Sequence, residues 1–215
     1  MNTVQKETIF VVDDDPLVRK GVQRLLKSAG YFTEVFPSAK EFLESDYSSE
    51  GPACLLLDLK MPGLSGFDLQ EELSAARYAM PIIFITGHGD IHSSVKAMKK
   101  GAVDFLSKPF EDQDLFDAIS VALKKDSKTR AVLNEKESIQ QKLDQLTLRE
   151  YEILTFVITG MLNKQIAYML DITEKTVKAH RGRVMAKMAV SSVAELVRIA
   201  EKIDVKPADV NKKQK

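Results

Sequence analysis

The stretch Ile9-Phe10-Val11-Val12-Asp13-Asp14-Asp15 decides the fold, because an apolar run ends there in three consecutive aspartates. Four further runs follow at helix-length intervals: Phe32–Phe36, Cys54–Leu57, Ile82–Ile85 and Val103–Leu106. Three of the five runs are continuously apolar, as expected of central parallel strands that are covered on both faces. The segments between them have helical spacing. This alternation over about 120 residues predicts an α/β domain with a five-stranded, doubly wound parallel sheet.

Overall composition is that of a folded protein, with 44% hydrophobic and 29% charged residues among 215. The net charge of zero hides an asymmetry: residues 1–125 carry 14 Lys/Arg and 19 Asp/Glu, which leaves 17 and 12 for the rest. An acidic half joined to a basic half favours a cation-binding module attached to a polyanion-binding one. A difference of this size also arises by chance. No segment approaches the roughly 18 apolar residues of a membrane span, so the expected compartment is the cytoplasm, without membrane association.

The remainder of the chain is predicted to be helical. A polar stretch, residues 124–130, leads into apolar positions at heptad spacing, namely Val132, Ile139 and Leu146 with Leu143 between them. Lys136 interrupts this pattern. We expect a mostly helical linker that is either a short coiled coil or a semi-rigid spacer.

A second domain is expected to begin at Leu146-Thr147-Leu148-Arg149-Glu150, where Thr147 and Glu150 have the spacing of a helix capping box. Four short helical segments follow, and the tail after Asp204 is expected to be frayed. The predicted organisation is therefore an α/β domain over 1–125, a helical linker over 126–144, an all-α domain over 145–204 and a tail over 205–215.

Acidic and basic side chains follow the predicted strands. Asp13, Asp14 and Asp15 follow the first strand, Asp58 ends the third, and Lys108 follows the fifth. The carboxyl ends of parallel strands meet at one edge, and clustered carboxylates recruit a cation or take up protons. Mg²⁺ suits such a site, and Lys108 would hold a phosphoryl group. Thr86, at the end of the fourth strand, offers a hydroxyl to the same ligand.

Four motifs at these positions resemble the signature of the receiver domain, over about residues 4–125: Val11-Val12-Asp13-Asp14-Asp15, Leu57-Asp58-Leu59-Lys60-Met61-Pro62-Gly63, Ile85-Thr86-Gly87 and Ser107-Lys108-Pro109-Phe110. Each motif is weak alone, whereas four in the right order are specific.

The resemblance implies that Asp58 is the phosphoacceptor. It also implies that Mg²⁺ is held by Asp14, Asp58 and the Lys60 carbonyl, with Asp13 assisting through water. Lys108 and Thr86 would contact the phosphoryl group, and Phe105 would change rotamer on activation. Many receivers have Tyr where this chain has Phe105, so a readout through a Tyr hydroxyl is in doubt. Asp15 is expected to have neither role, and His88 is expected to be a loop residue.

A basic helix follows a tight turn in the second domain. Asn163–Leu170, the turn 171–173 and Glu174–Met188 have the pattern of helix, turn and helix, with Thr173 as the second helix's N-cap. This helix carries five basic residues and no Asp or Glu after Glu174: Lys175, Lys178, Arg181, Arg183 and Lys187. Such a run is typical of a polyanion-binding surface, although charged helices usually just face solvent. Helical spacing places Val177, Val184 and Met188 on the buried side. Arg181 lies nearer to that side, so its stem is expected to pack while its tip reaches a phosphate.

Residues 146–203 also resemble the LuxR/NarL/FixJ-type DNA-binding domain, through Leu146–Glu150, Asn163–Ala167 and Thr176-Val177-Lys178-Ala179-His180. The resemblance implies that the helix from Glu174 enters the major groove, with Thr176 in the contact region and Lys178, Ala179 and Gly182 at base-reading positions. Gly182 is a departure at one of these positions. Glycine is a poor helix former, which costs a helix interior about 1 kcal/mol relative to Ala.

Together the two resemblances imply a two-component response regulator that acts as a transcription factor and not as an enzyme. Its implied partners are a sensor histidine kinase, promoter double-stranded DNA, RNA polymerase and, on phosphorylation, a second copy of the chain. Its phosphoryl chemistry would be limited to slow self-modification.

Three alternatives remain. A phosphatase with a covalent Asp nucleophile, of the haloacid dehalogenase type, carries a second Asp two residues on, where this chain has Lys60. A ligand-sensing regulator of the LuxR kind would have its ligand domain where the receiver motifs lie. An RNA-binding output is disfavoured by the resemblance of the basic helix.

Overall fold

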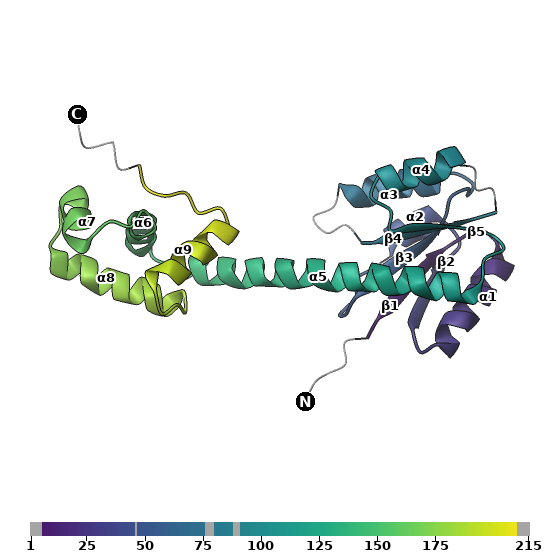
Figure 1. Cartoon of the computed structure of the whole chain (residues 1–215), viewed down its shortest axis with the longest axis horizontal. Helices are drawn as coiled ribbons and strands as arrows, with labels where there is room; N and C mark the ends of the chain where they lie inside the picture. Colours follow the sequence, from purple (N-terminus) through teal and green to yellow (C-terminus); the bar gives the residue numbers. More distant parts are fainter. Residues whose placement is uncertain (1–5, 46, 76–79, 88–90, 210–215) are drawn as a thin grey trace. The chain divides into compact units, whose positions relative to one another are not determined.

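The computed structural model describes residues 6–45, 47–75, 80–87 and 91–209 and divides the chain into two compact units, Met1–Arg130 and Ala131–Lys215 (Figure 1). The first unit is built on one sheet. Its strands are β1 (Thr8–Val12), β2 (Phe32–Phe36), β3 (Ala53–Asp58), β4 (Ile82–Thr86) and β5 (Asp104–Ser107). All neighbouring strands are parallel, in the order β2-β1-β3-β4-β5. The predicted fold class is confirmed.

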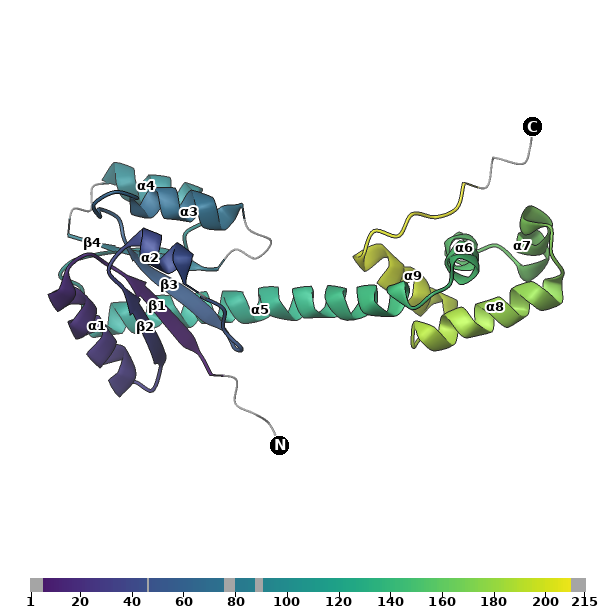
Figure 2. The same cartoon turned by 180° about the vertical axis from the view of Figure 1, so that it is seen from behind.

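Helices cover both faces of this sheet (Figures 1 and 2). One face packs against α1 (Pro16–Ser28) and the first part of α5 (Asp112–Asp144). The other face packs against α2 (Ala39–Glu44), α3 (Gly66–Ser74) and α4 (Ile91–Lys99). Alternate residues of each strand enter one core or the other, which explains why β1, β3 and β4 are buried along their whole length.

The helix α5 continues without a break from the first unit into the second. Residues 126–144, expected to form a helical linker, all belong to it. The boundary between the compact units lies after Arg130, five residues beyond the predicted end of the first domain at residue 125. The extra residues belong to the first unit because polar side chains tie them to its sheet.

That tie is formed by Asp126 and Arg130. The Asp126 side chain is fully buried, and its Oδ2 accepts hydrogen bonds from the Ala53 backbone nitrogen at 2.8 Å and from Arg130 Nε at 2.7 Å. The Arg130 guanidinium also donates to the carbonyl and the hydroxyl oxygen of Ser49, each at 2.8 Å. The start of the linker is therefore fixed to the segment that precedes β3.

We expect Asp126→Ala to destabilise the first unit by about 3 kcal/mol, because it leaves a buried amide and a guanidinium without their shared acceptor. Urea denaturation of the full chain measures this change. The matched control is Asp117→Ala, which removes an exposed carboxylate from the same helix and should cost no more than about 0.5 kcal/mol. Equal denaturation midpoints for the two variants would show that the tie is dispensable.

The second unit consists of the end of α5 with α6 (Leu148–Val157), α7 (Asn163–Leu170), α8 (Glu174–Lys187) and α9 (Val193–Lys202). Both predicted caps are confirmed: Thr147 and Glu150 form a capping box at α6, and Thr173 caps α8. Ile139 and Leu143 of α5 belong to this unit's core. The heptad positions Ile139 and Leu143 thus pack the end of α5 against the other helices of the second unit.

The expectation of a frayed tail was wrong for residues 205–209. Val205 and Ala208 pack against the core of the second unit, and the Ala208 backbone nitrogen donates to the Thr155 carbonyl at 3.0 Å. This segment is held because it carries two apolar side chains and gains a main-chain hydrogen bond to α6. Residues 210–215 lie outside the described part of the chain.

Candidate phosphoacceptor pocket and DNA-binding helix

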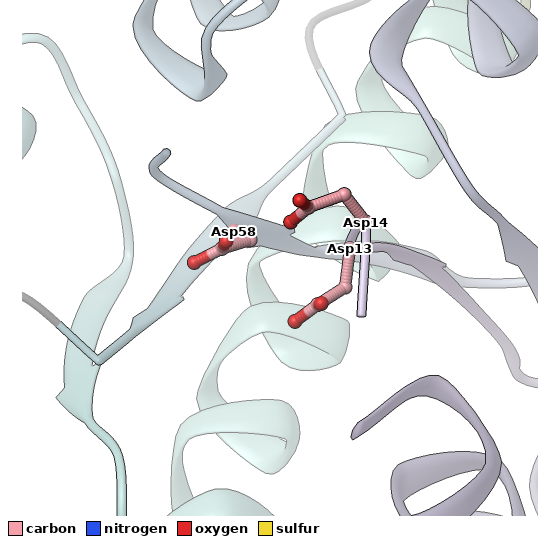
Figure 3. A group of neighbouring side chains, drawn as sticks. All are labelled: Asp13, Asp14 and Asp58. Carbon is pink, nitrogen blue, oxygen red and sulfur yellow. The ribbon is translucent and has the colours of Figure 1, made fainter. Parts of the chain in front are cut away.

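Three carboxylates gather at the carboxyl edge of the sheet (Figure 3). Asp13 and Asp14 directly follow β1, and Asp58 ends β3, the strand that pairs with β1. One oxygen from each side chain lies within 4.8 Å of the others, with Asp13 and Asp58 buried and Asp14 exposed. The sheet register causes this arrangement, because Val12 pairs with Leu57 and the residue after each of them, Asp13 or Asp58, carries a carboxylate.

Lys108 supplies the positive charge of this cluster. It follows β5, and its backbone nitrogen donates to the Thr86 carbonyl at 2.8 Å. Its Nζ lies 2.5 Å from Asp13 Oδ2 and 3.7 Å from Asp58 Oδ1. The ammonium therefore offsets part of the repulsion between these two carboxylates.

Asp58 is held in place by the backbone around it. Its Oδ1 accepts a hydrogen bond from the Leu59 backbone nitrogen at 3.0 Å. Burial raises the pKa of the Asp58 carboxyl above its ordinary value, whereas the Lys108 charge and the Leu59 hydrogen bond oppose that rise. A bound cation would therefore stabilise the ionised form of the Asp58 carboxylate.

Gly66 is a second support that the sequence did not reveal. It is the first residue of α3, and a Cβ there would clash with the main-chain oxygen of Asp58 and crowd Phe84. Its backbone nitrogen donates to the Leu59 carbonyl at 3.1 Å. Only glycine lets the start of α3 approach the end of β3 this closely.

The other expected pocket residues take varied places. Thr86 is buried at the end of β4, and Phe105 lies one strand further, partly buried against Phe84 with 6.3 Å between ring centroids. Lys60 is exposed in the loop after β3. Asp15, for which no role in the pocket was expected, caps α1 by accepting hydrogen bonds from the backbone nitrogens of Leu17 and Val18. His88 lies outside the described residues.

In the second unit, α8 presents the expected polar face. Val177, Val184 and Met188 are buried, as predicted. Five residues expected to contact DNA are exposed, and Thr176 is half-buried near the amino end of the helix; the exposed ones are Lys175, Lys178, Ala179, Gly182 and Arg183. A Cβ at Gly182 would meet nothing, so the domain's own packing does not require a glycine there.

Arg181 and Lys187 have partners within the domain. Arg181 Nη1 donates at 2.8 Å to the side-chain oxygen of Asn163, which is the first residue of α7. Lys187 Nζ donates to Glu150 Oε2 at 2.6 Å and to the Gln145 carbonyl at 3.0 Å. Of the five basic residues, three are exposed and two form hydrogen bonds within the domain. The amino-acid composition of the helix does not distinguish these two groups.

Across the described ranges, none of the helices combines the length and the apolar character that a membrane crossing requires.

Comparisons with known proteins match both units. Residues 9–120 match the family model of the response regulator receiver domain, and residues 144–200 match that of the bacterial regulatory proteins of the luxR family. Nodulation protein W of Bradyrhizobium diazoefficiens is 44% identical over 200 residues, covering 93% of this chain and 88% of that protein. The transcriptional regulatory protein FixJ of Rhizobium meliloti is 40% identical over 193 residues, covering 90% and 94%. Among solved structures, the response regulator StyR matches with a TM-score of 0.82 and 48% identity, over 92% of this chain and 99% of that one.

Proposed function

The chain belongs to the response regulators that join a receiver domain to a LuxR-type DNA-binding domain, and we propose that phosphorylation of Asp58 by a sensor histidine kinase controls its dimerisation and its binding to promoter DNA. The observation that carries this proposal is the pocket itself. A buried carboxylate at the end of β3 faces two further aspartates and a lysine ammonium. Exposed basic residues on α8 provide the surface that would meet DNA.

The donor set of the pocket fits Mg²⁺, which prefers oxygen ligands and retains several waters. Asp14 and Asp58 would hold the ion together with the Lys60 carbonyl, and Asp13 would assist through water. Asp14 is exposed and so leaves an open side for those waters. When bound, the ion neutralises negative charge on the carboxylates and on the phosphoryl oxygens.

In the proposed reaction an oxygen of the Asp58 carboxylate attacks the phosphorus of a phosphohistidine. A P–O bond forms, the P–N bond breaks, and the released imidazole takes a proton from solvent. Lys108 would bind the phosphoryl oxygens, within reach because its ammonium already lies between Asp13 and Asp58. The Thr86 hydroxyl would bind another of these oxygens, and the half-buried Phe105 ring would move with it. Slow attack by water would return Asp58 to its starting state.

A homodimer would bring two copies of α8 to paired half-sites. One short helix contacts only a few base pairs, so specific regulators generally sum two such interfaces. In the receiver domain, Ile91, Val95 and Met98 are all exposed along one side of α4, and Val121 is exposed on α5. These apolar side chains support α4 and α5 as the dimer contact, within residues 91–100 and 115–123.

The proposed DNA-contacting residues are the half-buried Thr176 and the five that α8 exposes: Lys175, Lys178, Ala179, Gly182 and Arg183. Arg181 is not among them because its Nη1 donates to the Asn163 side chain within the domain. We also propose RNA polymerase as a partner of the DNA-bound dimer, without assigning a surface to that contact.

We expect Lys108→Ala to bind Mg²⁺ about as well as the wild type, while phosphorylation no longer raises its affinity for DNA. The reason is that the ammonium is not a ligand of the cation, whereas it would bind the phosphoryl oxygens. Calorimetric Mg²⁺ titration and DNA titration with acetyl phosphate measure the two effects. Lys40→Ala, which removes an exposed lysine of α2, is the matched control and should behave as the wild type. A normal response to phosphorylation in Lys108→Ala would contradict this role.

A further inference from the structure

Lys187 was expected to contact DNA, but its ammonium is bound inside the domain. It is the last residue of α8, and its Nζ lies 2.6 Å from Glu150 Oε2 and 3.0 Å from the Gln145 carbonyl oxygen. It lies nine positions after the exposed Lys178, and at about 100° per residue the two side chains leave opposite sides of the helix. Lys187 therefore lies at the edge of the proposed DNA-contacting side, about 40° from Arg183, where its ammonium turns to partners inside the domain.

Glu150, the acceptor, is a buried charge at the start of α6. It is 3% exposed, and its Oε2 also accepts a hydrogen bond from the Thr147 backbone nitrogen at 3.0 Å. The hydrogen bond from Lys187, followed by that from Thr147, lowers the pKa of the Glu150 carboxyl to about 2. A buried carboxylate stays charged only where donors of this kind surround it, so Lys187 is its main counter-charge.

Gln145, the second acceptor, immediately follows the end of α5. The same ammonium thus joins three segments: the end of the linker helix, the capping box of α6 and the last turn of α8. Val184 of α8 and Met188, which directly follows Lys187, are buried in the same core as Ile139 of α5. Polar and apolar contacts together fix the carboxyl end of α8 against the end of the linker.

We propose that Lys187 is a positioning residue, which holds the recognition helix α8 against the end of the linker through Glu150 and Gln145 and does not neutralise a DNA phosphate. The inference rests on the proposed DNA-binding function and refines it. A phosphate contact and a positioning contact make different predictions. Removing a phosphate contact lowers the salt dependence of binding, by about 0.9 in the slope of log K against log salt. Removing a positioning contact spoils base contacts while leaving that slope unchanged.

The test uses the full-length phosphorylated chain and two fluorescein-labelled duplexes of equal length. One is enriched by the wild-type chain from a random-sequence library, and the other is a scrambled version of it. Anisotropy titrations at several KCl concentrations give the salt slope and the preference for the enriched duplex. The variants are Lys187→Gln, Glu150→Gln and both together, with Lys175→Gln as the matched control for loss of an exposed lysine from the same helix.

We expect Lys187→Gln and Glu150→Gln to lose about tenfold of the preference for the enriched duplex, as one spoiled base contact would cause. Their salt slopes should match the wild type, and the double variant should be no worse than either single one. Glu150→Gln is the most informative, since removal of a negative charge would tighten DNA binding if charge alone mattered. Lys175→Gln should lower the slope and keep the preference.

A fall of about 0.9 in the slope for Lys187→Gln, with equal or tighter binding by Glu150→Gln, would overturn the inference. So would wild-type preference in both variants. If circular dichroism shows that Lys187→Gln does not fold, Glu150→Asp decides, because it keeps the charge and only shortens the reach; it should lose preference at an unchanged slope. A wild-type chain that bound both duplexes equally would refute the proposed function and the inference with it, whereas failure confined to the variants leaves the function standing.

Discussion

Asp58→Asn is expected to accept no phosphoryl group from acetyl phosphate and Mg²⁺, whereas the wild-type chain becomes labelled. The amide of asparagine has no carboxylate oxygen to attack phosphorus, and none of the neighbouring aspartates occupies the end of β3. Labelling should fall to background, a loss of at least about 100-fold, since the covalent nucleophile itself is removed. Intact-protein mass spectrometry measures the added phosphoryl group directly.

Asp15→Asn is the matched control for this variant. It makes the same chemical change in the Asp13–Asp15 run, but Asp15 caps α1 and takes no part in the proposed chemistry. Asparagine caps helices about as well as aspartate, so this variant should fold and become labelled like the wild type. Labelling of Asp58→Asn at the wild-type level would show that another residue is the phosphoacceptor.

Phosphorylation is expected to convert the chain to a dimer and to raise its affinity for a two-half-site promoter by about 100-fold or more, because the second recognition helix then binds as part of the same complex. Analytical ultracentrifugation measures the mass, and titration of labelled DNA measures the affinity. Binding should also weaken steeply with salt, since several Lys/Arg–phosphate contacts release counterions.

Two variants separate the two halves of this expectation. Val95→Glu places a charge in the exposed apolar side of α4 and should prevent dimerisation, so that phosphorylation no longer tightens DNA binding. Lys178→Ala should weaken DNA binding and leave the dimer intact, because Lys178 lies on the exposed face of α8. A phosphorylated wild-type chain that sediments as a monomer would contradict this mechanism.

Most of the receiver pocket could be predicted because its residues are tied to strand ends. The runs before Asp13 and Asp58 are short and apolar, and Lys108 follows the short strand β5. Parallel pairing of these strands therefore brings the three side chains to one edge of the sheet. Periodicity likewise located the buried side of α8, where Val177, Val184 and Met188 are all in the core.

Long-range polar contacts could not be predicted in this way. The Asp126–Ala53 hydrogen bond joins residues 73 positions apart, and the Lys187–Glu150 pair joins residues 37 apart. In the sequence, Asp126 and Lys187 cannot be told from ordinary surface charges. The hydropathy of a charged residue does not reveal the distant partner that allows its side chain to be buried or bound inside a domain. The same limit explains the tail, where Val205 and Ala208 are too sparse to form a periodic pattern yet still pack.

The central claim is that the phosphoryl group on Asp58 controls DNA binding, and one titration tests it most directly. The wild-type chain and Asp58→Asn are each titrated against the same enriched duplex, with and without acetyl phosphate and Mg²⁺, at one fixed salt concentration. The proposed function predicts that only the wild type with acetyl phosphate binds tightly, by about 100-fold, while the other three conditions share one weak affinity. Equal affinity of the wild type with and without acetyl phosphate, or equal tightening in Asp58→Asn, would contradict it.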